Sequence, residues 1–234
     1  MTINLNPDER DKFSALASHW WDAEGPCRTL HDINPCRHDY VAAQLVLEGA
    51  RVADIGCGGG IFSEALARSG AHVTAIDAAA ELIEVARRHA AAQATPVHYE
   101  ALTAEELATR QPRHFDLVTC LELIEHVPQP ASLIAACAAL LKPGGVLVMS
   151  TLNRNAASYG LGVVMAEYVL KLVPRGTHDY MQFIRPSELA AMARAAGLAT
   201  RDVRGMHYDP FTRRARLSAR PLVNYLATFT RDAA

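Results

Sequence analysis

Two carboxylates and an imidazole lie close together in the segment CLELIEHVPQP, residues 120–130. Glu122, Glu125 and His126 are so spaced that on one turn of helix they would share a face. Such a set could hold a divalent cation, because carboxylate oxygens and imidazole nitrogens are metal ligands. Alternatively, Glu125 orients His126 as a general base. The plain alternative is that the segment only packs the start of a helix, so the residues alone leave all three roles open.

A glycine-rich loop, DIGCGGG, occupies residues 54–60 between an apolar segment and a helical one. Glycine adopts backbone angles closed to other residues and lets a ligand approach the main chain. The loop is expected at the carboxyl end of the first strand, where open α/β sheets bind ligands. A dinucleotide fingerprint, G-x-G-x-x-G, would need glycine where the chain has Ile61 or Ser63. The dinucleotide pattern therefore fails in both registers.

The loop instead reads D-x-G-x-G-x-G, which resembles motif I of class I S-adenosylmethionine-dependent methyltransferases. That cofactor carries no phosphate, so the loop would pack against its amino-acid and ribose parts. Asp77 ends the second expected strand, where a carboxylate can accept both ribose hydroxyls. Leu121 follows the fourth strand at the height expected for cofactor contacts. The alternative is that these glycines only form the tight turns of an ordinary α/β protein.

The elements that must position these residues follow from the hydrophobic pattern. Strands are expected at residues 51–55, 71–76, 96–100, 115–121 and 145–151, and helices at 61–69, 80–92 and 131–141. This alternation predicts right-handed crossovers and a parallel sheet covered on both faces. Further helices are expected at 8–21, 33–48 and 185–197, followed by two closing strands. We expect one structural domain, in which N-terminal helices (1–50) cover the site and the main fold (51–234) carries an insertion at about 154–185.

The composition limits the function classes. A chain of 234 residues with 50% hydrophobic residues can bury one substantial core, and its net charge of −2 gives no basic field for nucleic acid. Its five cysteines lack zinc-site or thioredoxin-like spacing, which indicates a reducing compartment. The polar start does not have the pattern of a signal peptide, so we expect a cytoplasmic protein.

A closer resemblance covers nearly the whole chain, from about residue 13 to about residue 225. It rests on the segments WWDAEGPCRTLHDINPCRHDYV, TCLELIEHVPQP, LLKPGGVLVMSTLNRN, AEYVLKLVPRGTHDY and MHYDPFT. With the glycine loop, these segments resemble the ubiquinone biosynthesis O-methyltransferase family. The resemblance implies a Rossmann-like class I methyltransferase fold, with a seven-stranded, mostly parallel sheet, helices on both faces and an inserted helix after the fifth strand. It also implies cofactor contacts at Arg37, Gly56, Asp77 and Leu121, to which the loop pattern adds Gly58.

Arg37 is a physically sensible cofactor residue, because a guanidinium can form paired hydrogen bonds with the methionine carboxylate; otherwise it is an ordinary surface cation. Eukaryotic relatives use a divalent ion in the Glu-x-x-Glu-His segment. The resemblance therefore implies Glu122, Glu125 and His126 as ligands for an ion such as Mg²⁺.

The resemblance implies S-adenosylmethionine as cofactor and two acceptors, 2-polyprenyl-6-hydroxyphenol and 3-demethylubiquinol. A phenol with a pKa near ~10 is mostly protonated at neutral pH. A chelated divalent ion would favour the phenolate, and without one His126 is the candidate base. Two alternatives stay open: a methyltransferase for another small phenol or carboxylic acid, and a non-catalytic S-adenosylmethionine-binding regulatory or assembly protein.

A prenylated acceptor would have to reach the site from a bilayer. An expected helix at 158–173 carries an apolar stripe, and basic residues flank it or cluster later in the chain: Leu161, Val164, Met165, Tyr168, Val169 and Leu172, then Arg154, Lys171, Arg175, Arg213, Arg214 and Arg216. This pattern predicts peripheral contact with anionic lipid of the inner membrane, unless the stripe only packs on the sheet. Partners in a quinone-biosynthesis complex are a further expectation. Trp20 and Trp21 either line a lipid pocket or belong to the core.

Overall fold

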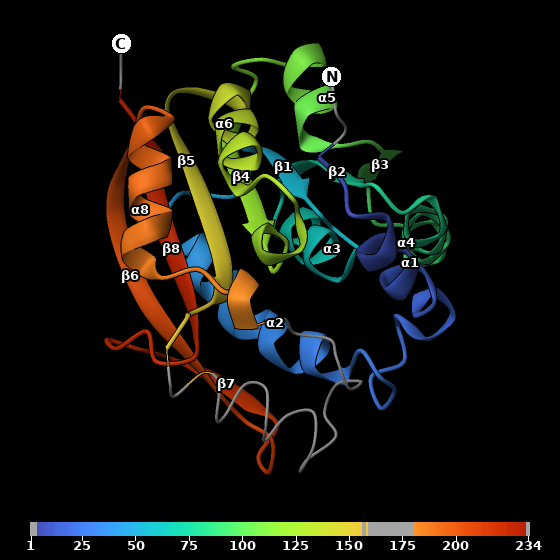
Figure 1. Ribbon diagram of the computed structural model, residues 1–234. Coiled ribbons are helices and arrows are strands. Elements are labelled where there is room, and N and C mark those ends of the chain that lie inside the picture. The colour runs from blue at the N-terminus through green and yellow to red at the C-terminus, as the bar shows by residue number, and fades with distance from the viewer. Residues whose placement is uncertain (1–3, 156–157, 159–179, 233–234) are drawn as a thin grey trace.

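The computed structural model describes residues 4–155, 158 and 180–232 (Figure 1). Its strands are β1 (Arg51–Ile55), β2 (His72–Asp77), β3 (Val97–Ala101), β4 (Phe115–Leu121), β5 (Leu141–Leu152), β6 (Leu198–Asp209), β7 (Arg214–Ser218) and β8 (Asn224–Arg231). The helices are α1 (Pro7–Ser14), α2 (Arg28–Ala42), α3 (Ile61–Arg68), α4 (Ala80–Ala92), α5 (Ala104–Arg110), α6 (Pro130–Leu140) and α8 (Pro186–Ala195). Short 3-10 turns are η1 (Ala17–His19), η2 (Ile124–His126) and η4 (Tyr180–Gln182).

The described strands form one sheet in the order β3-β2-β1-β4-β5-β8-β6-β7. The first five run parallel, whereas β8 is antiparallel to β5 and β6, and β7 is antiparallel to β6. The predicted mostly parallel α/β sheet is confirmed. It has eight strands rather than seven, because three strands follow α8 where the sequence predicted two.

Helices cover both faces of the sheet (Figure 1). On each face, a cluster of buried apolar residues joins the helices to the sheet. On one face the apolar residues of α5, α6 and α8 pack on the sheet, including Leu107, Leu133 and Leu189. On the other face α2, α3 and α4 do so, with Val41, Leu66 and Ile83 at the centre. Strand β1 contributes Ala53 to the first cluster and Val52 to the second, as expected of a parallel strand buried on both faces.

The strand order places the glycine loop at a switch point of the sheet. Strand β1 pairs with β2 on one side and with β4 on the other, and Ile55 is in register with Ile76 and Cys120. The next residue along each strand is Gly56, Asp77 or Leu121. Three of the predicted cofactor residues therefore lie side by side at the carboxyl edge, where open α/β sheets bind ligands.

Some elements differ from the prediction. The helix expected over 8–21 ends at Ser14 and is followed by η1. Helix α5 was not predicted, although Thr103 and Glu106 form a capping box that marks its start. The expected inserted helix, its apolar stripe, Lys171 and Arg175 lie outside the described residues.

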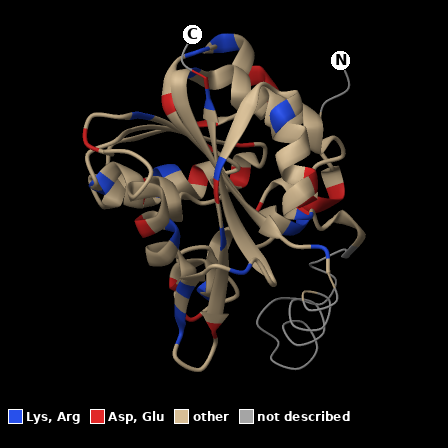
Figure 2. Cartoon of the chain, turned by 90° about the vertical axis from the view of Figure 1, so that its left-hand side faces the viewer, with Lys and Arg blue, Asp and Glu red and all other residues tan. Residues whose placement is uncertain are grey.

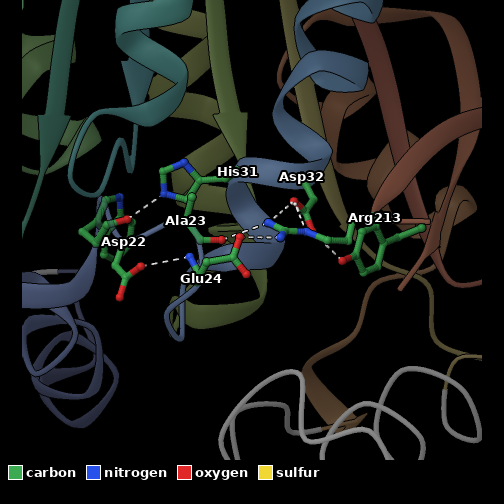
Figure 3. Close-up of polar contacts among 8 residues, drawn as sticks. Asp22, Ala23, Glu24, His31, Asp32 and Arg213 are labelled. Atoms are coloured by element: carbon green, nitrogen blue, oxygen red, sulfur yellow. Dashed lines mark hydrogen bonds and ion pairs between the residues drawn. The ribbon is translucent and has the colours of Figure 1, made fainter. Parts of the chain in front are cut away.

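The hairpin of β6 and β7 is tied to the N-terminal part of the chain (Figure 3). The guanidinium of Arg213 donates to both carboxylate oxygens of Asp32 on α2, at 3.0–3.2 Å, and to the carbonyl of Ala23. Tyr208 donates to Asp32 at 2.6 Å, and Arg213 also pairs with Glu24. These contacts hold the hairpin against the start of α2, beside the carboxyl edge of the sheet.

Candidate active site

A cavity of about 1020 Å³ opens at the carboxyl edge of the sheet. The loop after β1, the end of β2, the segment after β4, helices α1 and α2, and the β6–β7 hairpin all contribute to its wall. Every site residue that the sequence predicted lines it: Arg37, Gly56, Gly58, Asp77, Leu121, Glu122, Glu125 and His126. The fold thus brings together residues from four separate stretches of the chain.

The glycine loop has the conformation that its sequence predicts. Gly56 has a φ of 71° and Gly58 a φ of 55°, both in the left-handed region that favours glycine. A Cβ on Gly56 would lie 2.8 Å from Leu123 Cδ2, and one on Gly58 would overlap the indole of Trp20. The backbone angle therefore favours glycine at both positions, and at Gly58 the Trp20 ring also leaves no space for a Cβ.

The aspartate that opens the loop has a structural role. Asp54 is buried, and its carboxylate accepts hydrogen bonds from Ser63 at 2.6 Å and from Thr119 at 2.8 Å. Burial raises its pKa, although both hydroxyl donors act in the opposite direction. Asp54 thus links β1 to the start of α3 and to β4, and these contacts hold the start of the glycine loop in place.

Asp77 occupies the position predicted for a ribose-binding carboxylate. Its oxygens accept hydrogen bonds from the backbone N–H of Gly58 at 3.0 Å and of Ala79 at 2.8 Å. Burial raises the pKa of Asp77, and the backbone donors partly offset this effect. Each carboxylate oxygen has a second lone pair, so the carboxylate could accept two hydroxyls while it keeps these contacts.

Arg37 is buried rather than a surface cation, with 5% of its surface exposed. Its Nη2 lies 3.2 Å from Oε1 of Glu122. Neither Nε nor Nη2 has a hydrogen-bond partner among the described residues. A buried guanidinium with unmatched donors on a cavity wall is suited to receive a carboxylate ligand.

The segment after β4 does not form the helical turn that would align its acidic residues. Glu122 has a φ of 54°, which is rare for a residue other than glycine and typical of functional sites. Its Oε1 accepts hydrogen bonds from Ser150 at 2.6 Å and Asn224 at 3.0 Å. Glu125 is buried, and burial, followed by the charge of Glu122, raises its pKa well above the ordinary value.

His126 contacts a carboxylate that the sequence analysis did not single out. Its Nδ1 lies 2.8 Å from Oε2 of Glu9 on α1, and its ring forms a T-shaped contact with Phe13 at 5.1 Å between centroids. Glu9 is thus a carboxylate that orients this imidazole. No sequence signal links a residue of α1 to one that follows β4, because only the tertiary fold brings them together.

Comparison with known proteins agrees with this geometry. A sequence model described as a methyltransferase domain matches residues 33–203. A protein of Xanthomonas campestris pv. campestris (strain B100) named ubiquinone biosynthesis O-methyltransferase is 58% identical, over 96% of this chain and 94% of its own. A Xanthomonas oryzae pv. oryzae protein of the same name (strain PXO99A) is 57% identical over the same shares. This chain belongs to the ubiquinone biosynthesis O-methyltransferase family.

Solved structures confirm the predicted methyltransferase fold of this family member. Magnesium protoporphyrin IX methyltransferase from Synechocystis PCC 6803, solved with bound S-adenosylhomocysteine, has a TM-score of 0.66 at 18% identity, over 91% of this chain and 88% of its own. A possible histamine N-methyltransferase from Thermotoga maritima also reaches 0.66, at 17% identity, over 94% and 98% of the two chains. A [4+2]-cyclase matches with a TM-score of 0.63 at 18% identity, over 84% and 80%. The fold alone therefore does not define the reaction.

The residues predicted to bind a metal are not arranged as a site in this methyltransferase. Among the described residues there is no group of three or more His, Cys, Asp or Glu side chains that could hold an ion. The carboxylate of Glu122 contacts Arg37, Ser150 and Asn224, whereas the imidazole of His126 contacts Glu9. This arrangement does not fit a metal centre, and we derive no step through one.

Proposed function

We propose that this protein is an S-adenosylmethionine-dependent O-methyltransferase that acts on a hydroxyl of 2-polyprenyl-6-hydroxyphenol and of 3-demethylubiquinol. The observation that carries the proposal is one cavity, at the switch point of the sheet, lined by Arg37, Asp77 and His126. Its volume of about 1020 Å³ lies at the upper end of ligand pockets. That volume suits a cofactor and an acceptor ring together, as methyl transfer requires.

The cofactor side of the cavity fits S-adenosylmethionine, which when bound supplies an electrophilic methyl group on sulfur. Arg37 offers unmatched donors for the cofactor's carboxylate, and Asp77 offers acceptor positions for two ribose hydroxyls. Gly56 and Gly58 line this side of the cavity, and Leu121 contributes apolar wall. The contribution of these residues is to bind and orient.

The acceptor hydroxyl must reach the methyl group in line and lose its proton. A positioned oxygen gains much of its rate from being held in the reactive geometry. His126 lines the cavity, and the carboxylate of Glu9 fixes its ring through Nδ1. An imidazole oriented in this way is suited to take the phenolic proton as a general base.

The test is mass spectrometry of short-chain prenylated substrate analogues incubated with the protein and methyl-labelled S-adenosylmethionine. We expect the label on the ring oxygen and S-adenosylhomocysteine as the second product. Label on an unprenylated phenol but not on these analogues would reassign the acceptor. Absence of transfer to any acceptor by protein that binds the cofactor would support a regulatory or assembly role.

A second arm of this test addresses the divalent ion, such as Mg²⁺, that the resemblance implies. The reaction is run in EDTA and then with Mg²⁺ restored. Product loss in EDTA that Mg²⁺ reverses would mean that Glu122, Glu125 and His126 rearrange into a site when the acceptor binds. Full activity in EDTA would remove the ion from the mechanism.

Peripheral contact with anionic lipid is also part of the proposal. Among the described residues, no helix is both long and apolar enough to cross a bilayer. Basic residues, together with acidic ones, lie along the hairpin at the lower end of the molecule (Figure 2), and Arg214 and Arg216 on β7 are exposed. Phe211 at the hairpin turn is 89% exposed. Apolar and basic groups in this combination suit an anionic membrane surface.

Co-sedimentation with vesicles of phosphatidylglycerol tests this contact, with phosphatidylcholine vesicles as the neutral comparison. We expect binding to the anionic vesicles at low salt, weakened by salt and by Phe211→Ser. No sedimentation with anionic vesicles at low salt would exclude the membrane contact.

A further inference from the structure

Residues that line the cavity carry buried polar atoms without a hydrogen-bond partner in the described chain, although Arg37 Nη2 is ion-paired with Glu122. Most come from residues 20–37, namely Trp20 Nε1, Thr29 Oγ1, Asn34 Oδ1 and Arg37 Nε and Nη2, and the others are Glu125 Oε2 and Asn224 Oδ1. Burying a polar atom without a partner is costly, and most such atoms in proteins are paired. Because all of these residues line one cavity, a ligand bound there is a candidate partner for such atoms.

Trp20 is the member of this group closest to the glycine loop. It is 6% exposed, and its ring is the first group that a Cβ on Gly58 or on Gly59 would meet. The indole therefore lies directly against the loop that is predicted to carry the cofactor. An indole can only donate a hydrogen bond, so its N–H can pair only with an acceptor such as a ligand oxygen or nitrogen.

The neighbouring Trp21 differs, since its indole is already engaged. Its Nε1 donates to the carbonyl of Gly59 at 2.9 Å. Its ring stacks on His89 at 3.4 Å between centroids with 5° between planes, and His89 Nδ1 lies 2.7 Å from Glu64 Oε1. Trp21 thus fixes this part of the chain on the loop and α4, which leaves Trp20 in place with its N–H unmatched.

We propose that Trp20 is a further cofactor-binding residue, whose indole N–H donates to an oxygen of the S-adenosyl cofactor bound beside Gly58. This inference rests on the proposed function. Trp20 and Arg37 both line the cavity, and the indole N–H adds a donor to those of the guanidinium. The expected acceptors are the carboxylate and ribose oxygens of the cofactor.

The test uses the fact that the chain has only two tryptophans. In ¹⁵N-labelled protein the two indole N–H signals are assigned with Trp20→Phe and Trp21→Phe. The protein is then titrated with S-adenosylhomocysteine, and its affinity is measured in parallel by calorimetry. We expect the Trp20 signal to move downfield and to saturate with the calorimetric isotherm, and the Trp21 signal to move less.

Affinity measurements on variants complete the test. Trp20→Phe keeps a ring but removes the donor, so we expect S-adenosylhomocysteine to bind about 2- to 12-fold more weakly. The control is Tyr225→Phe, which removes a buried hydroxyl that donates to the carbonyl of Ile184 and does not line the cavity, and it should leave the affinity unchanged. If the wild-type protein binds the ligand while the Trp20 signal stays fixed, the inference is wrong. If the wild-type protein binds none, the proposed function fails and this inference with it.

Discussion

Arg37 and Glu122 meet on the wall of the cavity, with Nη2 of the arginine 3.2 Å from Oε1 of the glutamate. The arginine comes from α2, and the glutamate follows β4 with a left-handed backbone conformation. The carboxylate of Glu122 neutralises the buried guanidinium of Arg37 and orients it. Nε and Nη2 of Arg37 nevertheless keep donor capacity that the described residues do not use. This relationship leads directly to a test of the cofactor's carboxylate end.

Replacement of Arg37 by lysine keeps the charge but removes the planar set of donors. We expect Arg37→Lys to bind S-adenosylhomocysteine about 10- to 100-fold more weakly, because hydrogen bonds between charged groups are among the strong ones. Calorimetry measures the affinity. Arg214→Lys on the exposed face of β7 is the control and should match the wild type. Equal affinities for all three proteins would remove Arg37 from the cofactor site.

A pair of glycine substitutions separates the cost of backbone angle from the cost of lost space. Gly58 (φ 55°) and Gly144 (φ 76°) are both left-handed, but a Cβ overlaps Trp20 at Gly58 and meets nothing within 4 Å at Gly144. We expect Gly144→Ala to lower the free energy of unfolding by about 1–2 kcal/mol with normal cofactor affinity. Gly58→Ala should cost more in stability and also weaken S-adenosylhomocysteine binding. Urea unfolding measures the stability and calorimetry measures the affinity. Normal S-adenosylhomocysteine binding by a folded Gly58→Ala protein would contradict the prediction that Gly58 belongs to the cofactor site.

The sequence predicted the features of the site that depend on local pattern. The ends of β1, β2 and β4 follow from short apolar segments, so Gly56, Asp77 and Leu121 could be placed at one edge of a parallel sheet. The contacts of His126 could not be predicted, because Glu9 reaches it only through the position of α1.

Likewise, helical spacing predicted that Glu122, Glu125 and His126 share one face of a helix. Glu122 instead has a left-handed φ and lies before the 3-10 turn that contains Glu125 and His126. Trp20 was predicted as core or pocket lining without a defined role. Its position against the loop depends on how η1 packs, which no periodicity records.

The Glu9–His126 pair predicts a graded loss of catalysis. We expect His126→Ala to lower kcat by about 100-fold or more, which is the usual contribution of a general base. Glu9→Gln should lower kcat by a smaller factor, because the base remains while its orientation weakens. Asp11→Asn, on the same helix but paired only locally with Arg10 among the contacts described, serves as the control. The kcat values are measured from methyl-transfer kinetics at saturating cofactor. A wild-type kcat in the His126→Ala variant would exclude His126 as the general base.

The hairpin anchor predicts a loss of stability in acid. Burial alone would raise the pKa of Asp32, but hydrogen bonds from Arg213 and Tyr208 outweigh it and hold the pKa below its ordinary value of 3.8. The unfolded chain therefore takes up protons first as the pH falls, so this contribution is present above pH 3.8 and is lost as the pH drops through the folded-state value.

Urea unfolding as a function of pH measures this contribution. We expect Asp32→Asn to be less stable than the wild type at pH 7 and to approach it as the pH falls below 3.8. Arg213→Met should show the same deficit at pH 7, and the double variant should lose less than the sum of the two, since both remove one interaction. A stability gap that stays constant with pH, or effects that simply add, would contradict the anchor.

The most direct measurement is a calorimetric titration of the folded protein with S-adenosylhomocysteine and, separately, with NADH. The carboxylate of Asp77 beside the loop, together with the failed dinucleotide pattern, predicts one tight site for S-adenosylhomocysteine and no heat from NADH. Asp77→Asn, which retains an acceptor but no charge, should bind S-adenosylhomocysteine about 10-fold or more weakly. Uptake of NADH by protein that ignores S-adenosylhomocysteine would contradict the account.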